Sequence, residues 1–233
     1  MCYNGKVERN LPFKVAGSLK GGKMTTENFT LEDEFEDYKV ECEAALRTAE
    51  AKLINIKEMA RRHTSRSPFS SIDYRIKTLE SVIDKCERRG YAQNIDSIKK
   101  NVHDIAGLRI ITPFRDDIYT VVNMLRRVPG FNIDEEKDYV ENPKPNGYSS
   151  YHLNIQIEVY SPITGGSKLI PIEIQIRDKA MDLWATIEHI VKYKKDLAAP
   201  EVSEQFKHIA DTLVQFDDLA IKLRDYSSAL NLE

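Results

Sequence analysis

The sequence predicts an α+β fold in which a mixed, largely antiparallel sheet is flanked by helices. Two long segments, at about 31–63 and 203–230, carry apolar residues at three- and four-residue spacing, as amphipathic helices do. Between them, 151–160 and 168–177 alternate apolar and polar residues around a Gly-containing turn, which predicts a β-hairpin. The remaining elements are mixed irregularly, which excludes a regular series of parallel βα units.

The first elements are a long helix, a strand and a shorter helix. The helix over 31–63 has one apolar stripe and a charged opposite face. The segment 72–77 then alternates, with Tyr74 and two isoleucines on one face, which predicts a strand. Thr78 is a suitable N-cap for the next helix, and Gly90 is a suitable residue to end it.

The middle of the chain alternates between helical and extended patterns. In order, we expect a short helix or turn, a buried apolar strand, a helix, a marginal strand with a polar loop and, after the hairpin, a further helix, over 94–102, 105–112, 116–127, 131–150 and 178–195. Three parts follow from this order: a flexible N-terminal arm (1–30), one domain with its N-terminal helices (31–200), and a C-terminal helix (201–233).

The composition excludes several classes of protein. Hydrophobic residues make up 41% and charged residues 30%, as in a globular domain. The 34 Lys and Arg residues against 37 Asp and Glu give a net charge of −3, so a polyanion must be bound by a local basic cluster. The cysteines form no CxxC pair, and no apolar run can span a membrane or serve as a signal peptide. We therefore expect a cytoplasmic protein with no membrane partner.

A basic cluster follows the first strand. Arg75 and Lys77 project from one face of it, and Ser81 and Lys85 lie one turn apart on the next helix. Lysine supplies point charges and arginine a planar fork, so the cluster suits a polyphosphate with a stacked base. The alternative is an ordinary solvated strand and helix face.

Two carboxylates on apolar strands suggest a metal site. Asp104 precedes the buried strand 105–112, and Glu173 lies on the returning strand of the hairpin. Carboxylates held by strands of one sheet can share a Mg²⁺ ion that also binds substrate phosphates. Gly107 leaves room for a ligand beside the backbone. The alternative is a strand-edge turn in which Asp104 pairs with a nearby lysine.

Polar residues gather on the hairpin and on the loop before it. Glu173, Gln175 and Arg177 share one face of a β-branched strand, which displays them rigidly. The loop before the hairpin offers Lys144 for phosphate and Tyr148 as a flat ring for a base. A solvated sheet face and an ordinary Pro/Gly loop are the competing interpretations.

Taken together, these motifs resemble the synthetase domain of the RelA/SpoT family. The resemblance covers about residues 70–195. Its motifs, in order, are RIKTLESVIDK (75–85), DIAGLR (104–109), DYVENPKPNGYSSYH (138–152), EIQIR (173–177) and AMDLWATIEH (180–189). The short length, without a hydrolase half or a long regulatory tail, resembles the small alarmone synthetases, more the RelQ than the RelP type.

The resemblance implies a sheet of nucleotidyltransferase type and a GTP pyrophosphokinase. The β,γ-pyrophosphate of ATP would pass to the 3′-hydroxyl of GTP or GDP, with Mg²⁺ as cofactor and AMP as second product. Arg75 and Arg109 would sandwich adenine. The ATP phosphates would meet Lys77, Ser81 and Lys85. Asp104 and Glu173 would be catalytic and bind the metal, with Glu173 as base. The acceptor would meet Lys144, Asn146, Tyr148, His152, Gln175 and Arg177, with Tyr148 stacked on guanine.

Two other functions remain open from the sequence. A related pyrophosphokinase would use an adenosine nucleotide or the 3′ end of tRNA as acceptor. That choice would show at Tyr148 and at Ser149, where many relatives have a basic residue. A catalytically weak nucleotide- or RNA-binding regulator is the other alternative, although intact Asp104 and Glu173 argue against it.

The last helix bears on assembly. Its apolar stripe can pack on the sheet or on another copy of the chain. It consists of Phe206, Ile209, Leu213, Phe216, Ala220 and Leu223. The family resemblance implies a homotetramer, with a central cleft as an allosteric site for (p)ppGpp or with single-stranded RNA as a further partner.

Overall fold

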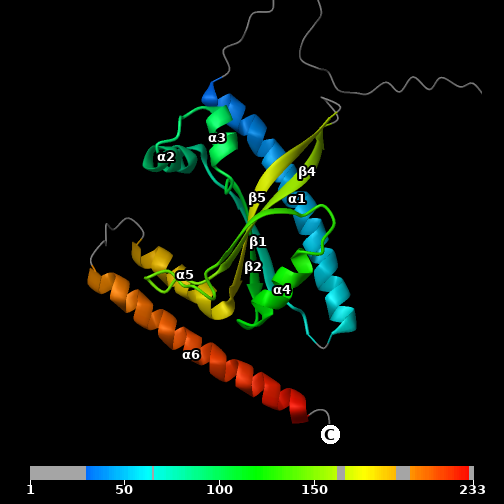
Figure 1. Cartoon of the computed structure of the whole chain (residues 1–233), viewed down its shortest axis with the longest axis vertical. Helices are drawn as coiled ribbons and strands as arrows, with labels where there is room; N and C mark the ends of the chain where they lie inside the picture. The colour runs from blue at the N-terminus through cyan, green and yellow to red at the C-terminus, as the bar shows by residue number, and fades with distance from the viewer. Residues whose placement is uncertain (1–29, 65, 162–165, 193–199, 231–233) are drawn as a thin grey trace, which may run out of the picture.

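The computed structural model describes residues 30–64, 66–161, 166–192 and 200–230. Its centre is a five-stranded sheet in the order β1-β2-β5-β4-β3 (Figure 1). The strands are β1 (Ser71–Ile76), β2 (Ala106–Thr112), β3 (Asn132–Asp138), β4 (Tyr151–Ser161) and β5 (Gly166–Asp178). The helices are α1 (Leu31–His63), α2 (Leu79–Arg89), α3 (Ile95–Asn101), α4 (Asp117–Leu125), α5 (Lys179–Lys192) and α6 (Pro200–Leu230).

The strand pairing confirms the predicted α+β fold and its mixed, largely antiparallel sheet. Three of the four pairings are antiparallel, and β2 pairs with β5 in parallel. The predicted hairpin is β4–β5, whose turn at 162–165 lies outside the described residues. In the parallel pair, Gly107 stands opposite Glu173. This pairing brings the segment that enters β2 beside the middle of β5.

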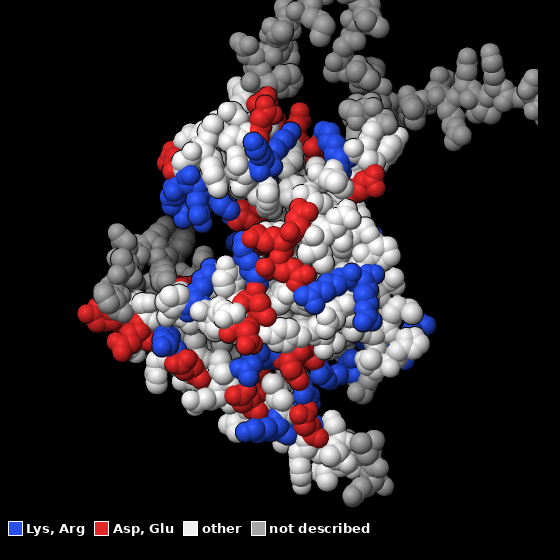
Figure 2. Space-filling model, in the orientation of Figure 1, with Lys and Arg blue, Asp and Glu red and all other residues white. Residues whose placement is uncertain are grey.

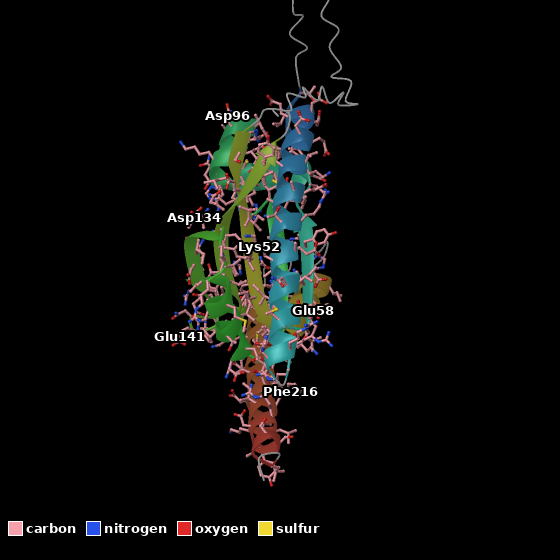
Figure 3. All side chains as sticks on the ribbon, turned by 90° about the vertical axis from the view of Figure 1, so that its right-hand side faces the viewer. Lys52, Glu58, Asp96, Asp134, Glu141 and Phe216 are labelled. Atoms are coloured by element: carbon pink, nitrogen blue, oxygen red, sulfur yellow. The ribbon has the colours of Figure 1, made fainter. Side chains whose placement is uncertain are left out.

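Helix α1 covers one face of the sheet, as the side view of Figure 3 shows. Thr30 caps it in a capping box, because its hydroxyl accepts from the Asp33 backbone N–H while the Asp33 carboxylate accepts from the Thr30 N–H. The predicted apolar stripe of α1 packs with α4 and the isoleucines of β5 in one core. Each large apolar side chain buried there stabilises the fold by about 1.5–3 kcal/mol relative to its exposed state.

Helix α2 begins and ends as the sequence predicts. The Thr78 hydroxyl accepts from the Ser81 backbone N–H at the first turn. Gly90 ends the helix with φ at 69°, a left-handed conformation that suits glycine. Val82 and Cys86 bury one side of α2, which fixes the rotation of the helix. Lys85 is thereby turned toward the start of β2.

Helices α5 and α6 form a second packed unit on the other side of the sheet (Figure 1). α5 follows β5 directly, and Asp178 caps it by accepting from the Met181 backbone N–H at 2.7 Å. Met181 and Trp184 of α5 pack against Phe206 and Ala210 of α6. The unit is separate from the α1 core, so the polar face of β5 lies between the two.

Several expectations change in detail. Tyr74, predicted on the apolar face of β1, is 63% exposed, because β1 is an edge strand. The predicted stripe of α6 divides: Phe206 packs on α5, whereas Phe216 and Leu223 are exposed. Apart from Thr30, the predicted arm over 1–30 lies outside the described residues. No helix in the described ranges is long and apolar enough to cross a membrane.

Candidate active site

The sheet face away from α1 carries a continuous polar cleft. Three adjoining pockets of about 840, 460 and 120 Å³ lie along it, and all three are lined by Arg75 and Gln175. In Figure 2 a hollow opens between the regions of α2 and α5, with Lys and Arg side chains at its rim. Although the chain is slightly acidic overall, the cleft therefore has the local basic character that a polyanion needs.

Asp104 sits at the entrance to β2 between two lysines. Its carboxylate accepts from the Lys77 Nζ at 2.6 Å and from the Lys85 Nζ at 2.8 Å. Burial raises the pKa of Asp104, but the hydrogen bonds and charges of the two lysines outweigh this effect and lower the pKa below its usual value. Asp104 is thus ionised at neutral pH, with two cations beside it.

Glu173 has a different set of partners. Its carboxylate contacts the His152 Nδ1 at 3.0 Å and accepts from the Gln175 Nε2 at 2.8 Å. Burial raises the pKa of Glu173, the contacts with His152 and Gln175 lower it more, and the nearby charge of Asp104 raises it slightly. The net pKa lies below the usual value, so Glu173 is also ionised.

The two carboxylates and Gly107 line the same 120 Å³ pocket. Mg²⁺ prefers oxygen ligands and is commonly held by one or two carboxylates together with substrate phosphates. Two ionised carboxylates facing one pocket fit that ligand set. The described residues contain no group of three or more His, Cys, Asp or Glu that could hold a metal ion. An ion here would therefore depend on oxygens from the substrate or water.

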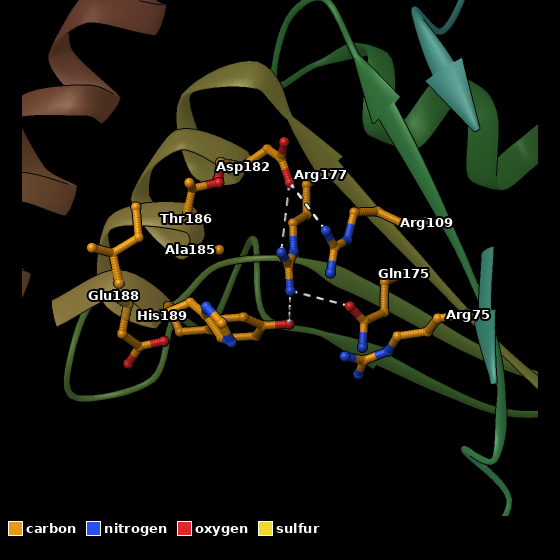
Figure 4. Close-up of a pocket in the computed structure, with 11 residues that line it drawn as sticks. Arg75, Arg109, Gln175, Arg177, Asp182, Ala185, Thr186, Glu188 and His189 are labelled. Carbon is orange, nitrogen blue, oxygen red and sulfur yellow. Dashed lines mark hydrogen bonds and ion pairs between the residues drawn. The ribbon is translucent and has the colours of Figure 1, made fainter. Parts of the chain in front are cut away.

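The largest of these three pockets lies between the sheet and α5 (Figure 4). Arg75 of β1 and Arg109 of β2 line it from the sheet, and Asp182 lines it from α5. Asp182 pairs with both Arg109 and Arg177, each at 3.8 Å from the carboxylate oxygen. The Nε atoms of Arg109 and Arg177 are buried and have no hydrogen-bond partner in the described part of the chain.

Tyr148, on the loop before β4, lines this 840 Å³ pocket and also the 460 Å³ pocket. Its hydroxyl lies 2.8 Å from the His152 Nε2 and accepts from the Arg177 Nη2 at 3.1 Å. The Lys144 Nζ lies 4.6 Å from the centre of the tyrosine ring. His152 also contacts Glu173, so a chain of hydrogen-bonding groups runs from Tyr148 to that carboxylate. The ring thus stands at a fixed place beside a cationic group.

The loop that carries Tyr148 is tightly closed. The Gly147 N–H donates to the Lys144 carbonyl at 2.8 Å, and the Lys144 N–H donates to the Tyr148 carbonyl at 3.0 Å. Asn146 donates to the Glu188 carboxylate of α5 at 2.8 Å and accepts from the Tyr148 N–H at 3.2 Å. Asn146, predicted to bind the acceptor, therefore braces the loop against α5 in this structure.

The structure brings most of the predicted residues to the cleft. Twelve of the thirteen lie on it or contact a residue that lines it, namely Arg75, Lys77, Lys85, Asp104, Arg109, Lys144, Asn146, Tyr148, His152, Glu173, Gln175 and Arg177. Ser81 differs from these, because it is exposed in the first turn of α2 and its described contacts are with Thr78.

Sequence reasoning missed residues contributed by α5. Asp182, Glu188 and Trp184 contact the arginines, the loop and the Tyr148 ring, respectively. The motif AMDLWATIEH (180–189) belongs to the family resemblance, but the sequence alone gives none of its residues a role. Its helical spacing was the available signal, since residues four apart, such as Asp182 and Thr186, share one face and line the pocket together.

Comparisons with known proteins identify the family of the chain. The region found in RelA/SpoT proteins matches residues 74–198. The Bacillus subtilis (strain 168) protein YwaC, named GTP pyrophosphokinase, is 37% identical over 159 residues, which is 68% of this chain and 75% of YwaC. YjbM of the same organism, with the same name, is 31% identical over 193 residues, 82% of this chain and 89% of YjbM.

A solved structure extends the likeness to the fold. Small alarmone synthetase 1 from Bacillus subtilis, bound to its product pppGpp, superposes with a TM-score of 0.77 at 31% identity. The superposition covers 84% of this chain and 98% of that one. The family match includes β2, β5, α5 and the Tyr148 loop, which are the elements that build the cleft. By its sequence match and its likeness in fold, the chain belongs to the RelA/SpoT family.

Proposed function

We propose that this chain is a GTP pyrophosphokinase that makes pppGpp or ppGpp and AMP from ATP and GTP or GDP. The names of YwaC and YjbM, and the pppGpp bound to the related synthetase, support the assignment. The single observation that carries it is the pair of ionised carboxylates, Asp104 and Glu173, in one pocket between an arginine-lined cavity and the Tyr148 loop.

The donor, ATP, is assigned to the β1–β2 side. Arg75 and Arg109 flank the 840 Å³ pocket, and planar guanidinium groups stack well on a base. Lys77 and Lys85 bring two positive charges to the carboxylate of Asp104, where a polyphosphate needs them. Ser81, at the start of α2, is proposed to meet the phosphates through its hydroxyl.

The acceptor, GTP or GDP, is assigned to the Tyr148 side. The tyrosine ring offers a stacking surface for guanine, and Lys144 lies over the same ring. Gln175, Arg177 and His152 complete this side, while Asn146 holds the loop in place. Stacking tolerates several bases, so adenosine nucleotides and tRNA ends belong among the acceptors to be tested.

The reaction needs an in-line displacement at one phosphorus atom. The 3′-oxygen of the acceptor forms a bond to the β-phosphorus of ATP as the bond to the α-phosphate oxygen breaks, and AMP leaves. Glu173 takes the proton of the 3′-hydroxyl, and its contact with His152 orients the carboxylate for this role. Positioning supplies most of the rate in chemistry of this kind.

Mg²⁺ is the proposed cofactor, held by Asp104 and Glu173 together with substrate oxygens. When bound, it would neutralise charge on the transferred phosphates. The protein's own part is to keep both carboxylates ionised, through two lysines at one and His152 with Gln175 at the other.

Assembly and location are also proposals. The family resemblance supports a homotetramer, and five exposed apolar side chains on the second half of α6 support self-association: Phe216, Leu219, Leu223, Tyr226 and Leu230. Assignment to the RelQ type, a cytoplasmic location, and (p)ppGpp or single-stranded RNA as an allosteric ligand belong to the same proposal, and the family resemblance supports them.

The test follows two labels through one reaction. Wild-type protein is incubated with Mg²⁺, ATP and unlabelled GTP, with the ATP labelled at the γ-phosphate in one sample and at the α-phosphate in another. We expect the γ-label in a guanosine nucleotide two phosphates longer than GTP, and the α-label in AMP. GDP, ATP and tRNA in place of GTP identify the acceptor. Label found only in inorganic phosphate, or in a product one phosphate longer, contradicts the proposal.

A further inference from the structure

We propose that the first half of α6 is the platform that positions the acceptor loop (residues 142–150), with Trp184 and Ala210 as its positioning residues. This inference rests on the proposed function, because it takes the loop to bind the acceptor. It adds that a helix outside the catalytic cleft sets the place of the Tyr148 ring.

The loop backbone rests directly on α6. Gly147 has φ at 86°, and a Cβ added there would lie 2.4 Å from the Ala210 Cβ and 3.3 Å from the Lys207 Cα. A Cβ does not fit at 2.4 Å and is crowded at 3.3 Å, so the contact depends on glycine on one side and alanine on the other. Gly147 directly precedes Tyr148, and the position of the ring therefore follows the position of α6.

Trp184 packs against the Tyr148 ring. It is fully buried, and its ring centre lies 6.0 Å from that of Tyr148 and 5.7 Å from that of Phe206 in edge-to-face contacts. Its indole N–H donates to the Phe206 backbone carbonyl at 2.8 Å, which ties α5 to α6. Loop, α5 and α6 thus meet around one tryptophan, and a shift of any of them moves the other two.

The second half of α6 contacts the segment that follows β2. The Arg224 guanidinium makes two 2.8 Å hydrogen bonds to the Asp116 carboxylate. The Asp217 carboxylate accepts from the Arg115 backbone N–H at 3.0 Å. These contacts join α6 to the segment between β2 and α4. They fix the position of α6 relative to the strands that carry Asp104 and Glu173.

A specific kinetic consequence follows. The proposed donor residues Arg75, Lys77 and Lys85 lie on or beside β1 and α2, away from the loop contact with α6. Lifting the loop should therefore weaken the acceptor and spare ATP. A displacement of about 1 Å can cost about 100-fold in rate, so a clear effect is expected from a side chain that cannot fit.

The main test is Ala210→Leu, assayed in the full chain. We expect the KM for GTP to rise about tenfold or more while the KM for ATP stays within about twofold. Trp184 is the single tryptophan of the chain, so its fluorescence gives an independent measurement. GDP should change its emission in the wild type, and in Ala210→Leu the midpoint should move to about tenfold higher GDP.

A second variant covers the case in which leucine unfolds α6. Trp184→Phe keeps a ring and loses the bond to the Phe206 carbonyl, so it should raise the KM for GTP several-fold with little change for ATP. Ala229→Leu, the same substitution at an exposed site near the end of α6, is the matched control and should leave both KM values unchanged.

The outcomes separate the two proposals. A folded Ala210→Leu or Trp184→Phe protein with the wild-type KM for GTP, or with equal rises for both substrates, overturns the platform and leaves the proposed function standing. Wild-type protein that makes no guanosine product overturns the function. Failure of GDP to change Trp184 emission in an active wild type also counts against the platform.

Discussion

The two carboxylates of the cleft stay ionised for different reasons. Asp104 is held by two lysines, which are charges that a phosphate chain can share. Glu173 is held by an imidazole and an amide, and neither needs to leave for the carboxylate to accept a proton. This difference supports Asp104 as a site of electrostatic binding and Glu173 as the base.

Glu173→Gln tests whether Glu173 is the base. The amide keeps the size of the side chain and removes the negative charge that accepts the proton, so kcat should fall by about 100-fold to 10,000-fold, the usual worth of a general base. Initial rates with saturating ATP and GTP measure it, and circular dichroism checks the fold.

Glu158→Gln makes the matched control. Glu158 lies on β4 of the same sheet but is exposed, away from the cleft. The same chemical change there should leave kcat near the wild-type value. Full activity in the Glu173 variant would remove the base from the mechanism and leave positioning as its main source.

At the scale of elements, the junction between β5 and α5 buries a carboxylate whose charged form is destabilised there. Asp178 is buried where the strand becomes the helix. Its pKa is raised to about 6: burial is the main cause, the Met181 N–H bond lowers the pKa in part, and the nearby Asp217 raises it. A good helix cap therefore sits in a place that disfavours its own charge.

Asp178→Asn should remove this cost. Between about pH 4 and pH 6 the folded chain binds more protons at Asp178 than the unfolded chain, so the contribution of Asp178 to the free energy of unfolding falls as pH rises. Asparagine keeps an oxygen for the Met181 N–H and carries no charge. The variant should gain up to about 3 kcal/mol over wild type at pH 7.5 and little at pH 4.

Urea unfolding at both pH values measures that difference. Comparing variant with wild type cancels the carboxylates with lowered pKa, such as Asp104 and Glu173, whose stabilising effect is lost as the pH falls. A gain that is equal at both pH values would assign the effect to packing or capping instead of charge.

At the scale of the whole molecule, the features that could be predicted from the sequence are those that local chemistry controls, such as helix ends and buried strands. Thr78 and Gly90 bound α2 as expected, and the apolar run before Pro113 is the buried strand β2. Asp104 and Glu173 also line one pocket, as the sequence suggests, because β2 and β5 are neighbouring strands.

Contacts between distant segments were beyond that reasoning. The meeting of Gly147 with Ala210, and the ties of Asp182 to two arginines, depend on how α5 and α6 fold back over the sheet. No local pattern encodes that path. The exposure of Tyr74 likewise depends on β1 being at an edge, which strand alternation does not reveal.

The second half of α6 is the largest feature that one chain leaves unexplained. Its exposed apolar residues follow one another at spacings of three, four, three and four, in the order Phe216, Leu219, Leu223, Tyr226 and Leu230. This is the heptad spacing of a helix that packs against another helix. Such a seam is better explained by a second copy than by solvent, and Figure 3 shows the end of α6 projecting past the sheet.

Charges placed on the seam should therefore dissociate the assembly. Light scattering after size exclusion is expected to give the wild type four times the 26.8 kDa mass of the chain, and the double variant Leu219→Glu with Leu223→Glu a smaller species. Each leucine loses about 1.5–3 kcal/mol of burial, and the added carboxylates repel one another across the interface. Ser203→Glu with Gln205→Glu adds the same two charges at exposed sites on the first half of α6 and should keep the wild-type mass. A wild-type chain that elutes as a monomer would show that the seam serves some other contact.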